Sequence, residues 1–197
     1  MSSVFSTYIQ LGFHHIFDLN AYDHMLFLLA LSAIYTLSDW RKVIALVTSF
    51  TVGHSVTLAL ATFNIIQFDT ALIEFLIPVT ILLTCITNFF KLKGAAGKQN
   101  TILSLHNLMA LFFGLIHGMG FAHSFAGTPL PRQDFLPALF SFNLGIEFGQ
   151  LAVLAIAYGG AALVWNRRWY AAVVERPACV VIAVIGLFMA VQRIAGS

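Results

Sequence analysis

Six stretches of the chain are long and apolar enough to cross a lipid bilayer as α-helices, and this feature limits the fold more than any other. One crossing needs about 20 mainly apolar residues. The stretches cover residues 21–37, 43–66, 71–92, 102–125, 135–165 and 178–194. The chain is 59% hydrophobic and 9% charged, whereas soluble domains carry about 25% charged residues. The sequence therefore predicts an all-α, polytopic transmembrane helix bundle that forms a single integral membrane domain over residues 1–197.

A short segment of mixed polarity, residues 4–17, precedes the first stretch. Its apolar residues, among them Tyr8 and Ile16, recur at helical spacing and predict a helix with one apolar face. We expect this helix to lie at the membrane interface or to be partly inserted; a seventh crossing is the alternative. No basic segment with a small-residue cleavage site precedes the first stretch, so we expect that stretch to act as the insertion signal.

Basic residues alternate between the predicted connections, and this alternation predicts the orientation. They lie after the first, third and fifth stretches, at Arg41, Lys42, Lys91, Lys93, Lys98, Arg167, Arg168 and Arg176. The other two connections contain only Arg132. Because basic loops stay in the cytoplasm, we expect a multi-pass protein of the bacterial inner membrane, surrounded by membrane lipid, with both termini facing outward.

Ionisable side chains gather in the outer half of this predicted bundle. A charged group inside a bilayer costs about 2.5 kcal/mol or more, so each one calls for an explanation. The predicted topology puts imidazoles or carboxylates of five stretches at similar depth: His14, His15, Asp23, His24, His54, Glu74, His117 and Glu147. Small or polar residues share their helix faces, namely Thr51 and Ser55 with His54, and Asn143 and Gln150 with Glu147. This convergence predicts one shared site.

Histidines and carboxylates without thiolates favour a divalent transition metal such as nickel, cobalt or zinc. A proton relay is the alternative. Magnesium would need more oxygen ligands, and both cysteines, Cys85 and Cys179, lie in apolar runs. The net charge of +2 gives no reason to expect nucleic acid as a partner.

Each of these residues also has an ordinary structural explanation. Asp23 lies three residues after Asn20, which is a capping-box arrangement at a helix start. His14, His15 and Glu74 are ordinary interfacial residues in this alternative, and His54, His117 and Glu147 make structural hydrogen bonds. Gly114 with Gly118, and Gly145 with Gly149, form small-residue motifs that bring helices close together.

Five blocks of the sequence resemble the HupE/UreJ family of small bacterial membrane proteins. They read HHIFDLNAYDH, FTVGHSVTLALA, EFLIPVTILLT, FFGLIHGMGFA and FNLGIEFGQ, and they lie between residues 12 and 154. The chain looks like a shorter branch of that family. The resemblance implies a nickel or cobalt permease, or an accessory protein of hydrogenase or urease systems. It also implies that Asp23, His24, His54, His117 and Glu147 are the motif positions.

We therefore expect a metal site made by Asp23, His24, His54, His117 and Glu147, with His15 as a further ligand or at the entrance. Glu74, Thr51, Ser55, Asn143 and Gln150 would support these ligands.

The expected function is divalent metal transport, and the alternative is an intramembrane zinc-dependent hydrolase acting on a lipid or an embedded chain. Homo-oligomers and metalloenzyme accessory proteins are the candidate protein partners. His106 is the obvious polar residue of the inner half.

Overall fold

The structure is a computed structural model that describes residues 2–18, 22–93, 105–126, 131–163 and 176–195. The described residues form helices and their connections without a strand, which confirms the all-α prediction. The helices are α1 (Ser2–Phe17), α2 (Asp23–Ser32), α3 (Trp40–Thr62), α4 (Thr70–Lys93), α5 (Leu105–Ala126), α6 (Phe135–Leu163) and α7 (Arg176–Ala195), with short 3-10 helices η2 (Leu37–Asp39) and η3 (Arg132–Asp134).

Five helices are long and apolar enough to cross a membrane, namely α3, α4, α5, α6 and α7. The expected first crossing over residues 21–37 is wrong, because α2 has only 10 residues and ends at Ser32. The helix cannot continue through this region because a capping box between Thr36 and Asp39 starts η2 there. The hydropathy of the sequence did not reveal the end of α2, because the residues between Ser32 and Thr36 are largely apolar.

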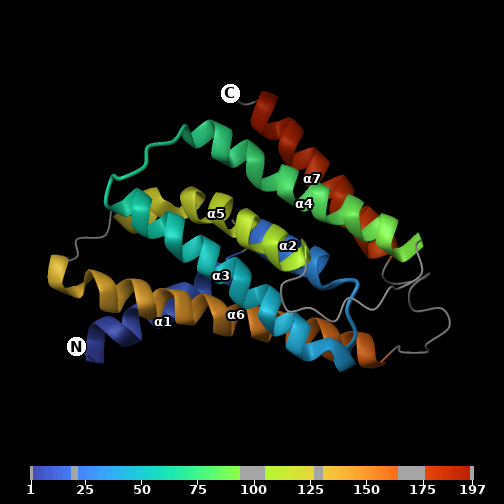
Figure 1. Cartoon of the computed structure of the whole chain (residues 1–197), viewed down its shortest axis with the longest axis horizontal. Helices are drawn as coiled ribbons and strands as arrows, with labels where there is room; N and C mark the ends of the chain where they lie inside the picture. The colour runs from blue at the N-terminus through green and yellow to red at the C-terminus, as the bar shows by residue number, and fades with distance from the viewer. Residues whose placement is uncertain (1, 19–21, 94–104, 127–130, 164–175, 196–197) are drawn as a thin grey trace.

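Helices α1 and α2 together take the place of the missing crossing. Helix α1 runs alongside the first half of α6, where Gly12 meets the backbone of Phe142 and Gly149 meets Ile16. Helix α2 continues toward the other end of α6, where the Tyr158 hydroxyl donates a hydrogen bond to the Ser32 carbonyl over 3.0 Å. Figure 1 shows α1 beside α6 and α2 in the middle of the bundle. Helix α1 thus packs along α6 rather than standing apart from the bundle.

Helices α3 and α5 pack so closely that side chains do not fit between their backbones. A Cβ atom added to Gly114 would lie 2.1 Å from the carbonyl oxygen of Phe50, and one added to Gly53 would lie 2.2 Å from that of Leu111. Both glycines are buried. This contact fixes the depth of His54 on α3 relative to His117 on α5.

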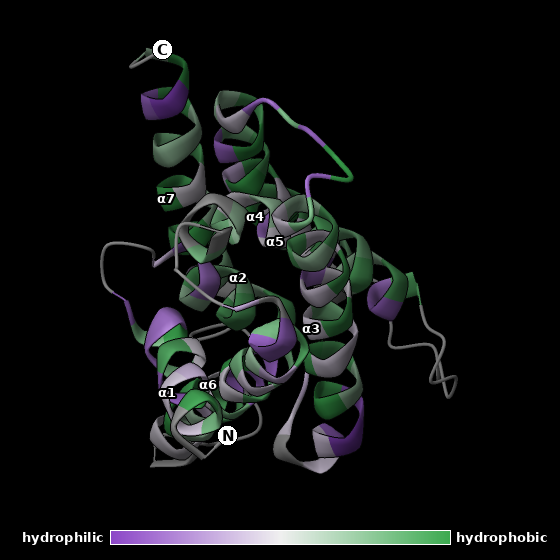
Figure 2. Cartoon of the chain, turned by 90° about the vertical axis from the view of Figure 1, so that its left-hand side faces the viewer, coloured by the Kyte–Doolittle hydropathy of each residue, from purple (hydrophilic) through white to green (hydrophobic). Residues whose placement is uncertain are grey.

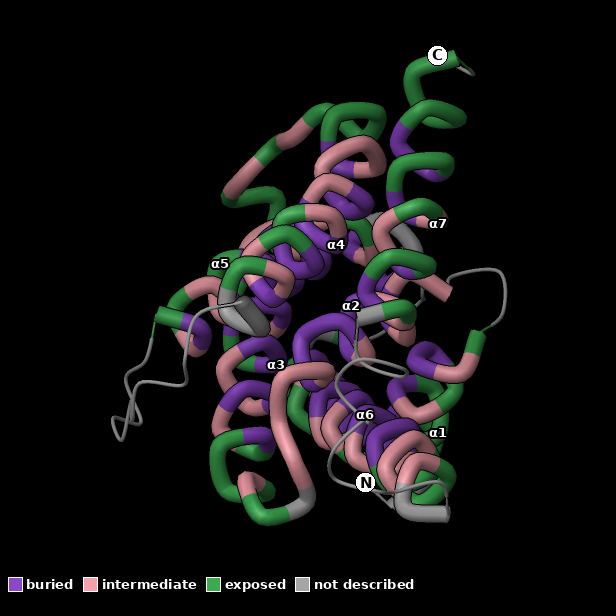
Figure 3. Tube along the Cα trace, turned by 90° about the vertical axis from the view of Figure 1, so that its right-hand side faces the viewer, coloured by how far each residue is buried: buried purple, intermediate pink, exposed green. Residues whose placement is uncertain are grey.

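Helices α4 and α7 form an antiparallel pair at one side of the bundle (Figure 1). Arg193 near the end of α7 and Glu74 near the start of α4 form an exposed ion pair of 2.8 Å. The outward face of α7 consists of large apolar side chains that are more than half exposed, including Val184, Leu187 and Phe188. Figures 2 and 3 show that apolar, exposed positions cover the outside of the long helices, as expected of surfaces that face lipid.

The two ends of the bundle differ in charge as the orientation rule predicts. Arg41 and Lys42 open α3, Lys93 closes α4 and Arg176 opens α7. Figure 1 shows these helix ends toward the same side, at the right, which we call the basic end. The predicted basic residues Lys98, Arg167 and Arg168 lie outside the described residues, as does the predicted cap Asn20.

Candidate metal site

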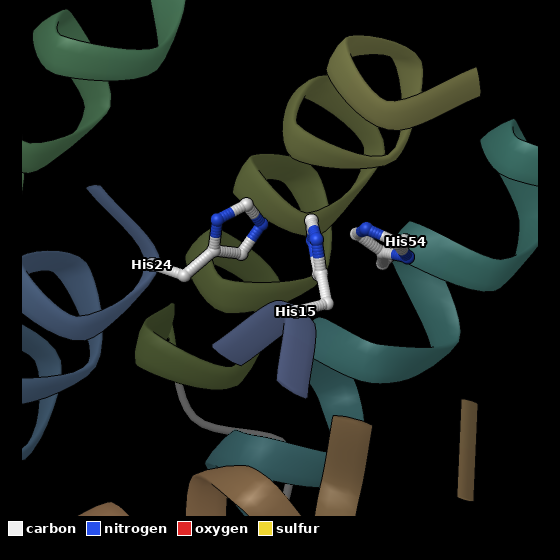
Figure 4. Close-up of side chains that lie close together, drawn as sticks. All are labelled: His15, His24 and His54. Atoms are coloured by element: carbon white, nitrogen blue, oxygen red, sulfur yellow. The ribbon is translucent and has the colours of Figure 1, made fainter. Parts of the chain in front are cut away.

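Three buried histidines meet inside the bundle. His15 near the end of α1, His24 at the start of α2 and His54 on α3 each offer a ring nitrogen, and these atoms lie within 4.8 Å of one another. Figure 4 shows His15 standing between His24 and His54. Metal–nitrogen bonds of about 2.0–2.1 Å place two ligands of one ion within roughly 4 Å of each other. Small rotations of the rings therefore suffice for a common metal ion.

The break between α1 and α2 is what brings two of these histidines together. His15 directly precedes Ile16, which contacts Gly149 of α6, so His15 is held level with the middle of that helix. His24 is the second residue of α2. The ring centroids of His15 and His24 are 4.5 Å apart. A continuous helix could not place residues nine positions apart in contact in this way.

Ring nitrogens at this site are buried without hydrogen-bond partners. Among the described residues they are Nε2 of His15, Nε2 of His24, Nδ1 and Nε2 of His54, and Nδ1 of His117. A buried polar atom without a partner costs about 1–3 kcal/mol, and such atoms are rare in native proteins. Four neighbouring histidines with this property fit a cation that accepts their lone pairs.

Asp23 fixes the orientation of His24. Its Oδ1 atom accepts a hydrogen bond from the His24 ring Nδ1 over 2.9 Å and another from the His24 backbone N–H over 2.8 Å. With Nδ1 protonated, the lone pair of His24 is on Nε2, the atom that has no partner. A carboxylate behind an imidazole is the usual arrangement for metal-binding histidines. This geometry favours Asp23 as the residue that orients His24.

His117 lies beside the cluster with its tautomer set by α4. The Thr80 hydroxyl donates its hydrogen to the Ile77 carbonyl over 2.7 Å. Because that hydroxyl has one hydrogen, the 3.1 Å contact between Thr80 Oγ1 and His117 Nε2 has the imidazole N–H as donor. The lone pair of His117 is then on Nδ1. The His117 ring centroid is 5.1 Å from that of His24, but His117 does not belong to the group of three histidines whose ligand atoms converge.

Phenylalanines surround the four imidazoles. Phe121 lies 4.1 Å from His15, and Phe27 and Phe50 lie 5.1 Å and 5.3 Å from His117, measured between ring centroids. Such apolar surroundings weaken the screening of charge and strengthen a metal–imidazole interaction.

Two carboxylates of the predicted set lie elsewhere. Glu147 accepts a hydrogen bond from the Thr48 hydroxyl over 2.6 Å, and Glu74 pairs with Arg193 at the surface. Neither belongs to the group of residues whose ligand atoms converge. The predicted topology gave Glu147 a depth similar to that of the histidines, but a position along a helix carries no information on the direction of the side chain.

The predicted supporting residues divide between α3 and α6. The Thr51 hydroxyl contacts Gln150 Oε1 over 3.0 Å, so these two residues join the helices. Ser55 donates to the Thr51 carbonyl within α3, and Asn143 donates to the Leu139 carbonyl within α6. Thr80, which sets the tautomer of His117, was missed by the sequence analysis. Its position on a helix with Thr84 and Asn88 at intervals of four residues was the available signal.

The depth of the N-terminal polar residues differs from the prediction. His15, Asp23 and His24 were expected at the outer end of the first crossing, but His15 lies level with the middle of α6. Polar residues and broken backbone are tolerated at membrane depth where they are enclosed by protein. His14 is exposed and does not belong to the buried cluster.

Replacing Asp23 with asparagine is expected to weaken metal binding without removing it. The amide removes the negative charge behind His24, and loss of such a partner typically lowers metal affinity about 10- to 100-fold. The measurement is a titration of the purified protein with cobalt in detergent. Asp69→Asn is the matched control, because Asp69 is an exposed residue that caps α4 outside the site. Equal affinities of the two variants would contradict this role.

A bundle of apolar helices around buried, unpartnered imidazoles defines a class, the multi-pass membrane proteins with a candidate metal site. The family model described as HupE / UreJ protein matches residues 1–193. The chain therefore belongs to the HupE/UreJ family, which is linked to metal handling. The search of the curated proteins and the search of the solved structures each gave no significant match.

Proposed function

We propose that this protein binds a divalent transition metal ion of the nickel or cobalt type and transports it across the bacterial inner membrane. The observation that carries the proposal is the convergence of His15, His24 and His54 around nitrogens that have no protein partner. Family membership supports a role in metal handling. We assign His117 as a further ligand and Asp23 as the residue that orients His24.

The position of the cluster supports transport rather than storage at the surface. His15 lies level with the middle of α6, between two half-length helices that meet at the site. Discontinuous helices with ion sites at their broken ends are a recurrent design in transporters. Since the described helix pairs bury the cluster, passage of the ion needs a rearrangement that opens it to each side in turn.

The zinc-dependent hydrolase remains the second candidate because three histidines and one open position are also the ligands of catalytic zinc. Hydrolysis additionally needs a general base near the metal-bound water. Asp23 is engaged by His24, and Glu147 is engaged by Thr48. Among the described residues no other carboxylate belongs to the cluster. The geometry therefore favours transport.

Transport is tested with purified protein in liposomes that contain a metal-sensitive fluorescent dye. We expect cobalt and nickel to enter protein-containing vesicles faster than protein-free vesicles, and we expect entry to be lost in His24→Ala. His14→Ala is the matched control because His14 is an exposed histidine of the same segment. Equal entry with and without protein would contradict transport. One zinc ion per chain that resists chelation would favour the hydrolase instead.

A further inference from the structure

A buried line of polar side chains leads away from the histidine cluster along α4. Thr80, Thr84 and Asn88 follow one another at intervals of four residues and are at most 2% exposed. Four residues of an α-helix rise about 6 Å, so the line extends roughly 12 Å from His117 toward the basic end. Figure 3 shows buried positions along α4 where it faces the interior of the bundle.

The hydrogen atoms of both threonine hydroxyls in this line point to the backbone. Thr80 donates to the Ile77 carbonyl over 2.7 Å, and Thr84 donates to the Thr80 carbonyl over 2.8 Å. Each hydroxyl has only one hydrogen. To any further partner these side chains therefore act as acceptors, as Thr80 does toward His117. Such a surface attracts cations and repels anions, and it cannot pass a proton from hydroxyl to hydroxyl.

Asn88 adds an amide oxygen to the same line. Its Nδ2 atom donates to the Ala30 carbonyl in the last turn of α2, which fixes the orientation of the amide. Its Oδ1 atom is then buried without a hydrogen-bond partner, and the residue is 0% exposed. A buried, unpartnered amide oxygen calls for a ligand. Ala30 lies six residues after His24, about 9 Å along α2, so Asn88 is on the basic-end side of the histidines.

We propose that Thr84 and Asn88 form a second, weaker cation station on the cytoplasmic side of the histidine site. This inference rests on the proposed transport function and adds the step by which the ion leaves the histidines. Neutral oxygens hold a transition metal ion less tightly than imidazoles do. A weak site next to a strong one gives the ion a stepwise route out of the bundle, since conduction needs sites that can be left as well as entered.

The test replaces oxygen atoms one at a time and compares metal uptake into liposomes. Thr84→Val keeps the shape of the side chain and removes its oxygen, and Thr84→Ser restores the oxygen. Thr87→Val is the matched control because Thr87 donates to the Thr84 carbonyl in the same helix but is only half-buried. Since one neutral polar contact is worth about 1 kcal/mol, we expect Thr84→Val to lower uptake roughly fivefold while Thr84→Ser and Thr87→Val keep it.

A second readout does not depend on transport. Manganese(II) prefers oxygen ligands, so His54→Ala, which lacks the complete histidine site, is titrated with manganese in detergent and the free ion is followed by electron paramagnetic resonance. We expect one weak manganese site per chain, which disappears when Thr84→Val or Asn88→Leu is added. Persistence of the weak site in both combined variants, or its absence from His54→Ala, would overturn the proposal.

The two readouts separate failure of this station from failure of transport. If the unaltered protein moves no metal, the transport function is wrong and the manganese titration alone decides whether the station exists. If the unaltered protein moves metal and Thr84→Val matches Thr87→Val in both assays, the station is overturned while transport stands. Histidine-site affinity for cobalt, measured in each α4 variant, is expected to remain within about twofold of the unaltered protein, because Thr84 and Asn88 do not belong to that cluster.

Discussion

Purified protein carrying His15→Ala is expected to lose its bound metal ion, while His14→Ala is expected to keep it. The two histidines are adjacent in the chain, but His15 is 9% exposed and belongs to the cluster, whereas His14 is exposed and lies outside it. Removing a ligand should cost more than removing a residue behind it, so we expect more than about a 100-fold loss of affinity. The two variants make the same substitution at adjacent positions, so a difference between their metal affinities reports which of the two side chains reaches the site.

The measurement is elemental analysis after gel filtration in mild detergent, followed by titration with cobalt and nickel. We expect His24→Ala and His54→Ala to behave like His15→Ala. We expect the same loss in His117→Ala, because we assign His117 as a further ligand. Its Nδ1 atom is the ring nitrogen of that residue that has no hydrogen-bond partner. Retention of one metal ion per chain in His15→Ala, His24→Ala and His54→Ala would refute the site.

Gly114→Ala is expected to destabilise the protein strongly. The new Cβ atom would lie 2.1 Å from the Phe50 carbonyl oxygen, a distance that atoms cannot keep, so α3 and α5 must move apart. Overpacking of this kind costs about 1–3 kcal/mol or more, which corresponds to a fall in melting temperature of roughly 3–10 °C for a chain of this size. Because the same contact holds His54 next to His117, metal affinity should fall as well.

Gly159→Ala is the matched control, since it makes the same substitution in a helix interior. Nothing lies within 4 Å of a Cβ atom added to Gly159, and alanine has a higher helix propensity by about 1 kcal/mol. We expect unchanged or slightly raised stability. The measurement is thermal unfolding in detergent followed by gel filtration. A Gly114→Ala protein as stable as the Gly159→Ala protein would contradict the packing of α3 against α5.

The long helices could be predicted from the sequence because burial in lipid requires a sustained run of apolar residues. The pair of short helices at the N-terminus could not. Residues 4–17 contain too many polar side chains to look like a crossing, and the apolar run that follows continues beyond the end of α2 at Ser32. Tertiary contacts decide the outcome here: Asn88 and Tyr158 satisfy carbonyl groups in the last turn of α2, and α6 lies along α1.

The histidines of the site could be predicted because imidazoles inside apolar helices are costly and rarely occur without a reason. The carboxylates were harder, since a helix position gives the depth of a side chain but not its partner. Glu147 and Thr48 pair across α6 and α3, and neither sequence position shows this. Asp23 was predicted as a ligand, and only the structure shows that its oxygen faces the Nδ1 atom of His24.

The division of the first crossing into two short helices has a consequence for how the protein is made. At about 1.5 Å per residue, α1 with 16 residues and α2 with 10 residues are each too short to span a bilayer alone. Helices α4 and α6, which pack against α1 and α2, emerge from the ribosome after them. The segment synthesised first is thus among the last to settle, and the histidines meet only when the rest of the chain is in place. An unfinished or misassembled chain therefore does not bring His15, His24 and His54 together.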